Sequence, residues 1–361
     1  MKVLMKGNEA VAEAAIKAGC RLYFAYPITP QSELIEYMSR KLPLCNGRFI
    51  QAESELAAIN MVYGAAASGR RVMTSSSSPG ISLKMEGLSY IAGANLPMVV
   101  VNVQRGGPGL GDIQPSQGDY FQATKGGGHG DYRLIVFAPC SVQESADLIE
   151  KAFNLADKYR NPTMILTDGL IGQMMEPVEF KDDLTSFQLE ELDSQHLTWC
   201  LSPNLTKREK HVIKAFEIDP KNLEKQVENQ KLKYDQIEKN EVMFEEFNIN
   251  SDNQYLIVAF GIAARIAKSA IENMKKKGVN IGLIRPITLW PFPTQKIKSL
   301  TDKKIKKVFV LELNLGQMVE DVRLAIEGKV PIEFYGRTGG MVFTPSDIEK
   351  FVCSHIQGGG K

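Results

Sequence analysis

The sequence predicts an α/β protein of two domains joined by a charged connector. Helix and strand signals alternate through residues 1–180, which favours a parallel, doubly wound sheet. The alternation resumes at Gln254 and predicts a second, smaller α/β domain over residues 254–361. Between them, roughly a third of residues 181–250 are charged and none is glycine, so residues 181–253 are predicted to form a connector or arm.

In the first domain, each strand is a short apolar run and each helix follows a turn or capping signal. Pro97–Val103 (PMVVVNV) is the clearest buried strand, because it is β-branched and uncharged. The other predicted strands are Leu22–Ala25, Phe49–Ala52, Arg71–Thr74, Arg133–Ala138 and Thr163–Thr167. The predicted helices cover residues 7–18, 31–41, 54–68, about 80–93 and 141–159, with Ser54 as a helix cap.

The connector contains one long polar helix signal over residues 221–246, with little to bury. A surface arm or interdomain linker is the favoured interpretation, and an oligomer contact is the alternative. In the second domain, the predicted strands are Leu256–Phe260, Val279–Arg285, Val308–Leu313 and Ile332–Tyr335, and the predicted helices are Arg265–Lys277 and Gln317–Ile326.

Composition excludes several classes of protein. The 361 residues include 43 Lys plus Arg and 42 Asp plus Glu, so no charge excess favours nucleic acid or an anionic membrane. The five cysteines are widely spaced and form no CxxC motif, which excludes a zinc ribbon or a ferredoxin-type cluster motif on this chain. Neither a signal peptide nor a membrane span is indicated, and we expect a cytoplasmic protein with reduced thiols and no metal site of its own.

Candidate site residues lie in the turns that follow the strands, where open α/β sheets bind ligands. Glu55 opens a helix beside apolar residues; it is either a surface carboxylate favoured by the helix dipole or a buried one that exchanges a proton or holds a heterocycle nitrogen. Arg105 follows the clearest strand; it is either a surface residue or a clamp for a substrate carboxylate. Serines after a strand usually cap a helix or bind an anion, but Ser77 or Ser78 with His129 as base would make a hydrolase.

The glycine loops that follow Arg105 and Lys125 lack the spacing of the common nucleotide-binding motifs. They are longer than turning the chain requires, so we expect them to approach a ligand or a partner subunit.

Together, YPITP at residues 26–30, the Ser-Glu pair that opens a helix at Glu55 and the strand that ends in Arg-Gly-Gly at Arg105 resemble the 2-oxoacid:ferredoxin oxidoreductases. These are thiamin-diphosphate enzymes that oxidatively decarboxylate 2-oxoacids to acyl-CoA and CO2. The stretches AESELAAINMVYGAA, SSSSPGISLK and RGGPGLGDIQPSQGDYFQATKGGGHGDYR are most similar to alpha subunits that act on branched-chain 2-oxoacids such as 2-ketoisovalerate. The resemblance implies a pyrimidine-type thiamin-diphosphate-binding domain over residues 1–180 and a transketolase-C-terminal-like domain over residues 254–361.

The resemblance also implies a role for each candidate residue. Glu55 would hydrogen-bond N1′ of the cofactor's aminopyrimidine, Thr29 would contact the substrate or the bound intermediate, and Arg105 would receive the substrate carboxylate. The further residues it places at the cofactor or in the cleft are Tyr26, Pro27, Ile28, Ser77, the rest of the Ser75–Ser78 run and His129.

The chain lacks the GDG motif that marks a diphosphate-binding domain. The resemblance therefore implies a beta subunit that brings the diphosphate and Mg²⁺ site, and small subunits that bring iron–sulfur (4Fe–4S) clusters. Ferredoxin would accept the electrons, and CoA and a 2-oxoacid would be the substrates. We expect a hetero-oligomer that is inactive as the chain alone, with a homodimer of the isolated chain as the alternative. The open alternatives are a pyruvate- or 2-oxoglutarate-specific enzyme, a non-catalytic scaffold subunit and the Ser/His hydrolase.

Overall fold

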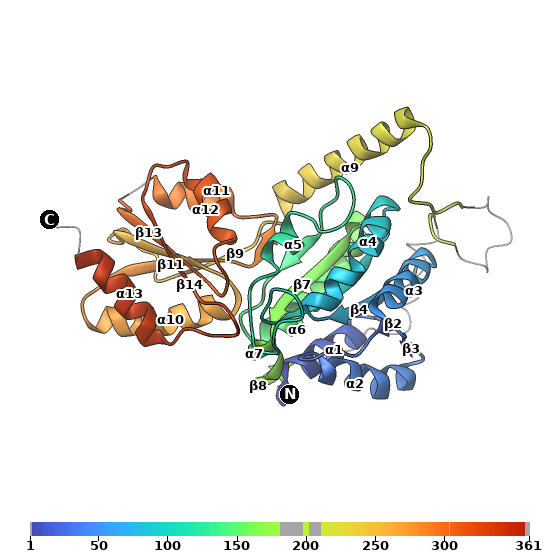
Figure 1. Ribbon diagram of the computed structural model, residues 1–361, viewed down its shortest axis with the longest axis horizontal. Coiled ribbons are helices and arrows are strands. Elements are labelled where there is room, and N and C mark those ends of the chain that lie inside the picture. The colour runs from blue at the N-terminus through green and yellow to red at the C-terminus, as the bar shows by residue number, and fades with distance from the viewer. Residues whose placement is uncertain (1, 181–197, 202–210, 303, 358–361) are drawn as a thin grey trace.

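A computed structural model describes residues 2–180, 198–201, 211–302 and 304–357 of the chain. Two units, each built around one sheet, lie side by side along the long axis of the molecule (Figure 1). The N-terminus lies at the larger unit and the C-terminus at the smaller one.

The larger unit contains a seven-stranded sheet in the order β12-β6-β7-β5-β4-β2-β3. Every neighbouring pair is parallel except β12 with β6, so the predicted parallel, doubly wound sheet is confirmed. The central strands β5 and β7 are buried along their whole length, as their apolar sequences require in a sheet covered on both faces. The strands are β2 (Leu22–Ala25), β3 (Arg48–Gln51), β4 (Val72–Ser76), β5 (Met98–Gln104), β6 (Ile135–Phe137), β7 (Pro162–Asp168) and β12 (Thr288–Trp290).

Helices cover both faces of this sheet (Figure 1). On one face α1 (Gly7–Lys17) packs against α2 (Ser32–Lys41) and α6 (Val142–Tyr159), and on the other α3 (Glu55–Ala67) packs against α4 (Ser78–Gly93). The helices before and after β3 lie on opposite faces because the chain reverses direction across the sheet after β3. Connections of the usual right-handed kind then place α2 and α3 on different sides. Ser54 caps α3 as predicted, its hydroxyl accepting from Ala57 N at 3.1 Å.

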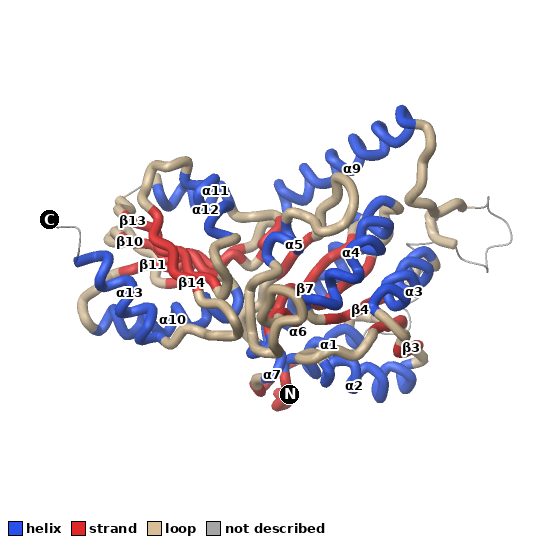
Figure 2. Tube along the Cα trace, in the orientation of Figure 1, coloured by secondary structure: helices blue, strands red, loops and turns tan. Residues whose placement is uncertain are grey.

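The smaller unit contains a five-stranded sheet in the order β14-β13-β10-β11-β9, parallel except for β9 (Figure 2). Its strands are β9 (Phe244–Phe247), β10 (Tyr255–Ala259), β11 (Ile281–Pro286), β13 (Lys307–Glu312) and β14 (Ile332–Gly336). Its helices are α10 (Gly261–Lys276), α11 (Thr294–Thr301), α12 (Met318–Ile326) and α13 (Pro345–Gln357). α10 packs against α13, and α11 packs against α12.

Two strands cross between the regions that the sequence suggested. β12 comes from the C-terminal region but extends the first sheet, and β9 comes from the charged connector but extends the second. The predicted domain limits at residues 180 and 254 therefore remain predictions, because each sheet includes a strand from beyond its own predicted domain.

The helix of the connector differs from the prediction in its end and in its burial. α9 (Pro220–Asn240) stops six residues early, and it buries Gln230, Tyr234 and Ile237. The Tyr234 ring meets Trp290 edge-on at 5.7 Å, and Gln230 Nε2 donates to Ala92 O at 3.0 Å. One face of the helix thus packs on the larger unit, which a count of its polar residues does not reveal.

The remaining elements are short. β1 (Lys2–Lys6) and β8 (Met175–Glu179) pair as an antiparallel ribbon. A 3-10 turn spans Leu42–Cys45, and two five-residue helices are α5 (Tyr120–Thr124) and α7 (Gly169–Gln173). Over the described ranges no helix is both long and apolar enough to cross a membrane.

Two buried side chains join the units. The Gln117 side chain donates to Phe260 O at 2.8 Å and accepts from Leu313 N at 2.9 Å. Arg285 of β11 forms a two-pronged ion pair with Glu144 of α6, with N–O distances of 2.9 and 2.6 Å. Because these contacts replace water at buried polar groups, they fix how the two units sit together.

Candidate active site

Four of the predicted turns converge on the N-terminal end of α4, at the carboxyl edge of the first sheet. α3 brings Glu55 to this point, and β4 brings Ser76 and Ser77. The residue after β5, Arg105, bonds directly to Ser78 at the first position of α4. The site is therefore built where α/β sheets usually bind ligands.

Glu55 is a buried carboxylate held against the backbone of α4. Its side chain lies close to Gly80, where an added Cβ would stand 2.5 Å from Glu55 Oε1 and 2.1 Å from Ser76 Oγ. Glycine is thus required at position 80 for the carboxylate to reach this place. Glu55 is only 6% exposed, yet it makes no hydrogen bond or ion pair with any described residue.

Two hydroxyls beside Glu55 are also unpartnered. Ser76 Oγ and Ser77 Oγ are buried without a hydrogen-bond partner in the part of the chain that the structure describes. Buried polar groups are normally paired, so a carboxylate and two hydroxyls left without partners favour a ligand with N–H donors at this place. A heterocycle such as the cofactor's aminopyrimidine fits this set of groups.

Arg105 ties the Tyr26–Pro30 turn to the glycine loop. Its guanidinium donates to Thr29 O at 2.9 Å and to Leu110 O at 2.8 Å. Only 7% of the residue is exposed, and its Nε is buried without a partner among the described residues. Arg105 is therefore not a free surface residue, and it lies beside Thr29 as a substrate clamp requires.

Asp119 and Asn102 support this arrangement, and sequence reasoning missed both. Ser78 Oγ donates to Asp119 Oδ2 at 2.6 Å and accepts from Arg105 N at 3.0 Å. Asn102 Nδ2 donates to the same carboxylate oxygen at 2.8 Å. Burial raises the pKa of Asp119, and the bonds from Ser78 and Asn102 oppose this. An amide inside an otherwise apolar strand was a signal that could have located Asn102.

The other candidate residues are distributed unevenly around this point. Tyr26, Pro27 and Thr29 are exposed, and Ile28 is half-buried. Ser75 lies on the opposite face of the sheet, where its hydroxyl bonds Tyr23 OH at 2.5 Å and also Gln31. The structure therefore does not bring Ser75 to the cleft, because alternate residues of a strand point to opposite faces.

His129 is also not brought to Glu55 or Arg105. It is exposed in the Lys125–Asp131 loop, whose glycines pack on Met85 near the middle of α4. None of the described side chains hydrogen-bonds it, and Ser78 is bonded to Asp119 instead. The pairing of serine and histidine that a hydrolase needs is thus not formed.

At the end of β7, Asp168 caps α7 by accepting from Leu170 N at 2.9 Å and Ile171 N at 3.1 Å. Burial raises the pKa of this carboxyl to about 6, and the backbone hydrogen bonds oppose the rise. No group of three or more potential metal ligands occurs within the described ranges.

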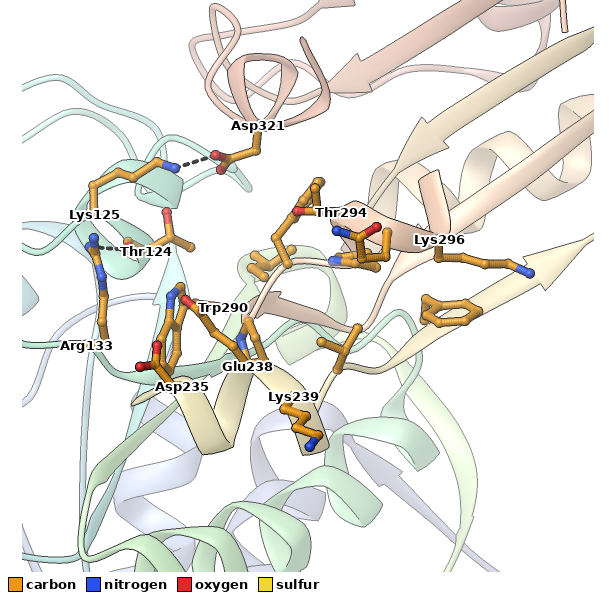
Figure 3. A pocket seen from close by; sticks show the side chains of 17 residues that line it. Thr124, Lys125, Arg133, Asp235, Glu238, Lys239, Trp290, Thr294, Lys296 and Asp321 are labelled. Atoms are coloured by element: carbon orange, nitrogen blue, oxygen red, sulfur yellow. Dashed lines mark hydrogen bonds and ion pairs between the residues drawn. The ribbon is translucent and has the colours of Figure 1, made fainter. Parts of the chain in front are cut away.

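A cavity of about 900 Å³ lies elsewhere, between α5, α9, β12 and the start of α11 (Figure 3). Lys125, Arg133, Trp290 and Lys296 contribute to its wall, and Lys125 pairs with Asp321 at one side. Glu55, Thr29 and Arg105 do not line it. Its mixed charges give no indication of a ligand, so it is not the site predicted from the sequence.

Comparison with known families identifies the class of protein to which this fold belongs. The model of the pyruvate flavodoxin/ferredoxin oxidoreductase family, thiamine diphosphate-binding, matches residues 13–246. The model of pyruvate:ferredoxin oxidoreductase core domain II matches residues 253–348. The chain belongs to the 2-oxoacid:ferredoxin oxidoreductases, which confirms the resemblance and the class of enzyme.

Individual relatives are subunits of such enzymes. A ketoisovalerate oxidoreductase subunit VorB of Methanothermobacter thermautotrophicus is 48% identical, over 96% of this chain and 95% of its own length. A 2-oxoglutarate synthase subunit KorA of Methanocaldococcus jannaschii is 35% identical over 98% of this chain and 100% of its own length. Because these relatives are named as subunits, the family works in complexes of more than one chain.

Solved structures agree with the fold. The 2-oxoglutarate:ferredoxin oxidoreductase of Magnetococcus marinus superposes with a TM-score of 0.85 at 28% identity, over 99% of this chain and 65% of that one. A split-gene transketolase superposes with a TM-score of 0.59 at 12% identity, which shows the fold alone.

Proposed function

We propose that this chain is the alpha-type subunit of an enzyme that oxidatively decarboxylates a branched-chain 2-oxoacid, such as 2-ketoisovalerate, to acyl-CoA and CO2. The observation that carries the proposal is the unpartnered, buried carboxylate of Glu55 on Gly80, within a chain 48% identical to a ketoisovalerate oxidoreductase subunit. The electrons would pass to ferredoxin.

Glu55 would hydrogen-bond N1′ of the aminopyrimidine, accepting from it when N1′ is protonated, and Ser77 and the Tyr26–Ile28 turn would border the cofactor. Thiamin diphosphate, when bound, supplies the nucleophilic carbon and the electron sink of the reaction.

Arg105 would receive the 2-oxoacid carboxylate beside Thr29. Its buried Nε–H has no partner among the described residues, and Leu110 O is an acceptor that a carboxylate would replace. A carboxylate carries a full negative charge, so it would bind the guanidinium more strongly than the neutral carbonyl of Leu110 does.

The rest of the catalytic assembly would come from other chains. A beta subunit would bring the diphosphate and Mg²⁺ site, and small subunits would bring the iron–sulfur clusters, since no CxxC motif occurs in this sequence. These requirements imply a hetero-oligomer.

The decisive experiment reconstitutes the chain with its beta and small subunits and follows CoA- and 2-oxoacid-dependent reduction of a viologen dye. Activity should require the mixture, and Glu55→Gln should lower kcat by about 100-fold or more, as loss of a general acid–base contact does. Glu53→Gln, two residues earlier and exposed, is the matched control and should retain activity. Full activity of Glu55→Gln contradicts the proposed role of Glu55.

Substrate choice is tested in the same assay. The specificity constant kcat/KM should be highest for 2-ketoisovalerate, because the described surroundings of Glu55 and Thr29 offer no second cation beyond Arg105 and the buried Lys84 for another carboxylate. A preference for 2-oxoglutarate is the second candidate, and the similarity to a 2-oxoglutarate synthase subunit and to a 2-oxoglutarate:ferredoxin oxidoreductase favours it.

A further inference from the structure

The side chain of Gln317, at the start of α12 in the smaller unit, bonds the backbone on both sides of Asp119. Its Nε2 donates to Gly118 O at 2.8 Å, and its Oε1 accepts from Phe121 N at 2.8 Å. A single side chain of one unit therefore holds, at two points, the backbone that carries Asp119 in the other unit.

The remaining neighbours of this aspartate are bonded to the smaller unit as well. Gln117 N donates to Leu313 O at 3.0 Å, and Gln117 O accepts from Asn314 Nδ2 at 2.8 Å. Tyr120 is fully buried, and its hydroxyl donates to Asp321 Oδ2 at 2.5 Å. The smaller unit thus fixes the two residues before the aspartate and the two residues after it.

The carboxylate of Asp119, in contrast, bonds the candidate site of the larger unit. Its Oδ2 accepts from Ser78 Oγ at 2.6 Å and from Asn102 Nδ2 at 2.8 Å. The other acceptor within reach of the Ser78 hydroxyl, Arg105 O, is farther away at 3.4 Å. A hydroxyl has one proton, so donation to Asp119 leaves Ser78 Oγ free to accept from Arg105 N, at 3.0 Å. Asp119 therefore fixes the direction of the hydroxyl that holds the Arg105 backbone.

The guanidinium of Arg105 depends on the same loop between β5 and α5. It donates to Leu110 O at 2.8 Å, and Leu110 belongs to this loop. The loop packs on Gly340 of the smaller unit, where an added Cβ would stand 2.3 Å from Gln114 Cβ and 2.9 Å from Asp112 Oδ2. The loop that positions both the backbone and the side chain of Arg105 thus lies against the smaller unit.

We propose that the smaller unit takes part in binding the 2-oxoacid, through contacts that run from Gln317 to Asp119 and on to Arg105. Asp119 is a positioning residue that sets Arg105 for the substrate carboxylate. The use made of Arg105 rests on the proposed function, whereas the row of hydrogen bonds is a property of the free chain. Neither Gln317 nor Asp119 needs to touch the substrate or the cofactor for this role.

Hydrogen exchange of the Arg105 amide in the isolated full chain tests this row of contacts. Gln317→Leu keeps the approximate size of the side chain and removes both of its hydrogen bonds, so it should speed the exchange about tenfold. Gln143→Leu is the matched control, because Gln143 also bonds one N–H and one C=O of the backbone, both of Glu179 and away from the site. It should leave the exchange of the Arg105 amide unchanged.

Asp119→Ala tests the second half of the row. It removes the acceptor of the Ser78 proton, so the hydroxyl can turn to Arg105 O, and exchange of the Arg105 amide should rise to a similar extent. In the double variant with Gln317→Leu, the increase should be little more than in Asp119→Ala alone, because the two changes act through one row of contacts. Increases that multiply, or an Arg105 amide that neither change affects, would overturn the proposal.

In the reconstituted complex, Gln317→Leu and Asp119→Ala should each raise KM for the 2-oxoacid about tenfold and leave kcat and KM for CoA within about threefold, because the contact of Arg105 with the carboxylate is already made in the bound substrate. Gln143→Leu should leave all three constants unchanged. A fall in kcat without a rise in KM for the 2-oxoacid would show a merely structural role and would overturn the proposal. Absence of any 2-oxoacid activity in the unmodified complex would count against the proposed function alone, because the exchange measurements still decide the row of contacts.

Discussion

Asp168 makes the carboxyl edge of the first sheet sensitive to pH. Its ordinary pKa is 3.8 and burial raises it to about 6 in the folded chain. Below pH 3.8 the carboxyl is protonated in both states. As pH rises to about 6 the unfolded chain releases the proton first, so this group destabilises the fold progressively, by about 3 kcal/mol in total.

We therefore expect Asp168→Asn to stabilise the chain at neutral pH and to change little near pH 4. Asparagine caps a helix about as well as aspartate, but it carries no charge. The free energy of unfolding in urea, measured at pH 4 and pH 7.5, should show a difference from wild type that grows with pH. A difference that is the same at both pH values would show that burial of the charge is not the cause.

Sequence patterns located the residues that begin or end an element, and they missed those whose importance depends on packing. Glu55 and Arg105 stand at such ends, and the structure places both at α4. Lys84 and Asp119 stand in stretches that read as an ordinary helix and loop. Their importance follows from contacts that local patterns do not show, of Lys84 with Thr74 in β4 and of Asp119 with Asn102 and Ser78.

Among the elements, the loop between β5 and α5 is held by contacts with the smaller unit. Both polar ends of the Gln117 side chain bond backbone groups of the smaller unit, and the residue is 1% exposed. The same loop carries Leu110, whose carbonyl accepts from Arg105. Gln117 therefore links the position of the substrate loop to the second sheet.

Gln117→Leu should lower the free energy of unfolding by about 1–3 kcal/mol, because it leaves the buried Leu313 N–H unpaired, whereas Phe260 O keeps its bond from Ala264 N. Gln143→Leu is the matched control: Gln143 also bonds one N–H and one C=O, both of Glu179, but in an exposed place. Its loss should cost less than about 1 kcal/mol. Urea unfolding together with hydrogen exchange at the Leu313 amide would distinguish the two, and equal losses would contradict the role given to Gln117.

Elements with a clear apolar pattern were predictable, including the four-residue strand β2, whereas some short elements without one were missed. The strand PMVVVNV and the helix over residues 141–159 match β5 and α6 closely. β1, β8 and β12 have three to five residues each, and each exists because of a partner strand distant in the sequence. A local pattern cannot contain that information.

At the scale of the whole molecule, we expect Arg285 to decide whether the two units unfold together. Its guanidinium is 3% exposed and pairs with Glu144 of the first unit and Glu245 of β9. Breaking a buried pair by removing one partner costs about 3–5 kcal/mol, because the other charge is left uncompensated. Glu144 would be that uncompensated charge, whereas Glu245 keeps its ion pair with Lys268.

Differential scanning calorimetry should show one transition for the wild-type chain and two for Arg285→Met. Arg265→Met is the control, since Arg265 also bridges the units, to Glu176, but its side chain is 40% exposed. It should lower Tm slightly and keep one transition. Two transitions in the wild type would mean that Arg285 does not couple the units.

The placement of β12 has consequences for folding during synthesis and for the design of hybrid genes. The first sheet lacks its edge strand β12 until residue 290 has been synthesised. The strand of this sheet that precedes β12 in the sequence is β7, which ends at Asp168, more than 110 residues earlier. Until then β6 presents an open edge, which is a surface for pairing between nascent chains. A hybrid gene joined between the two family matches, near residue 250, would give the first sheet an edge strand from another parent. The boundary that looks natural in the sequence is therefore a poor place to exchange halves.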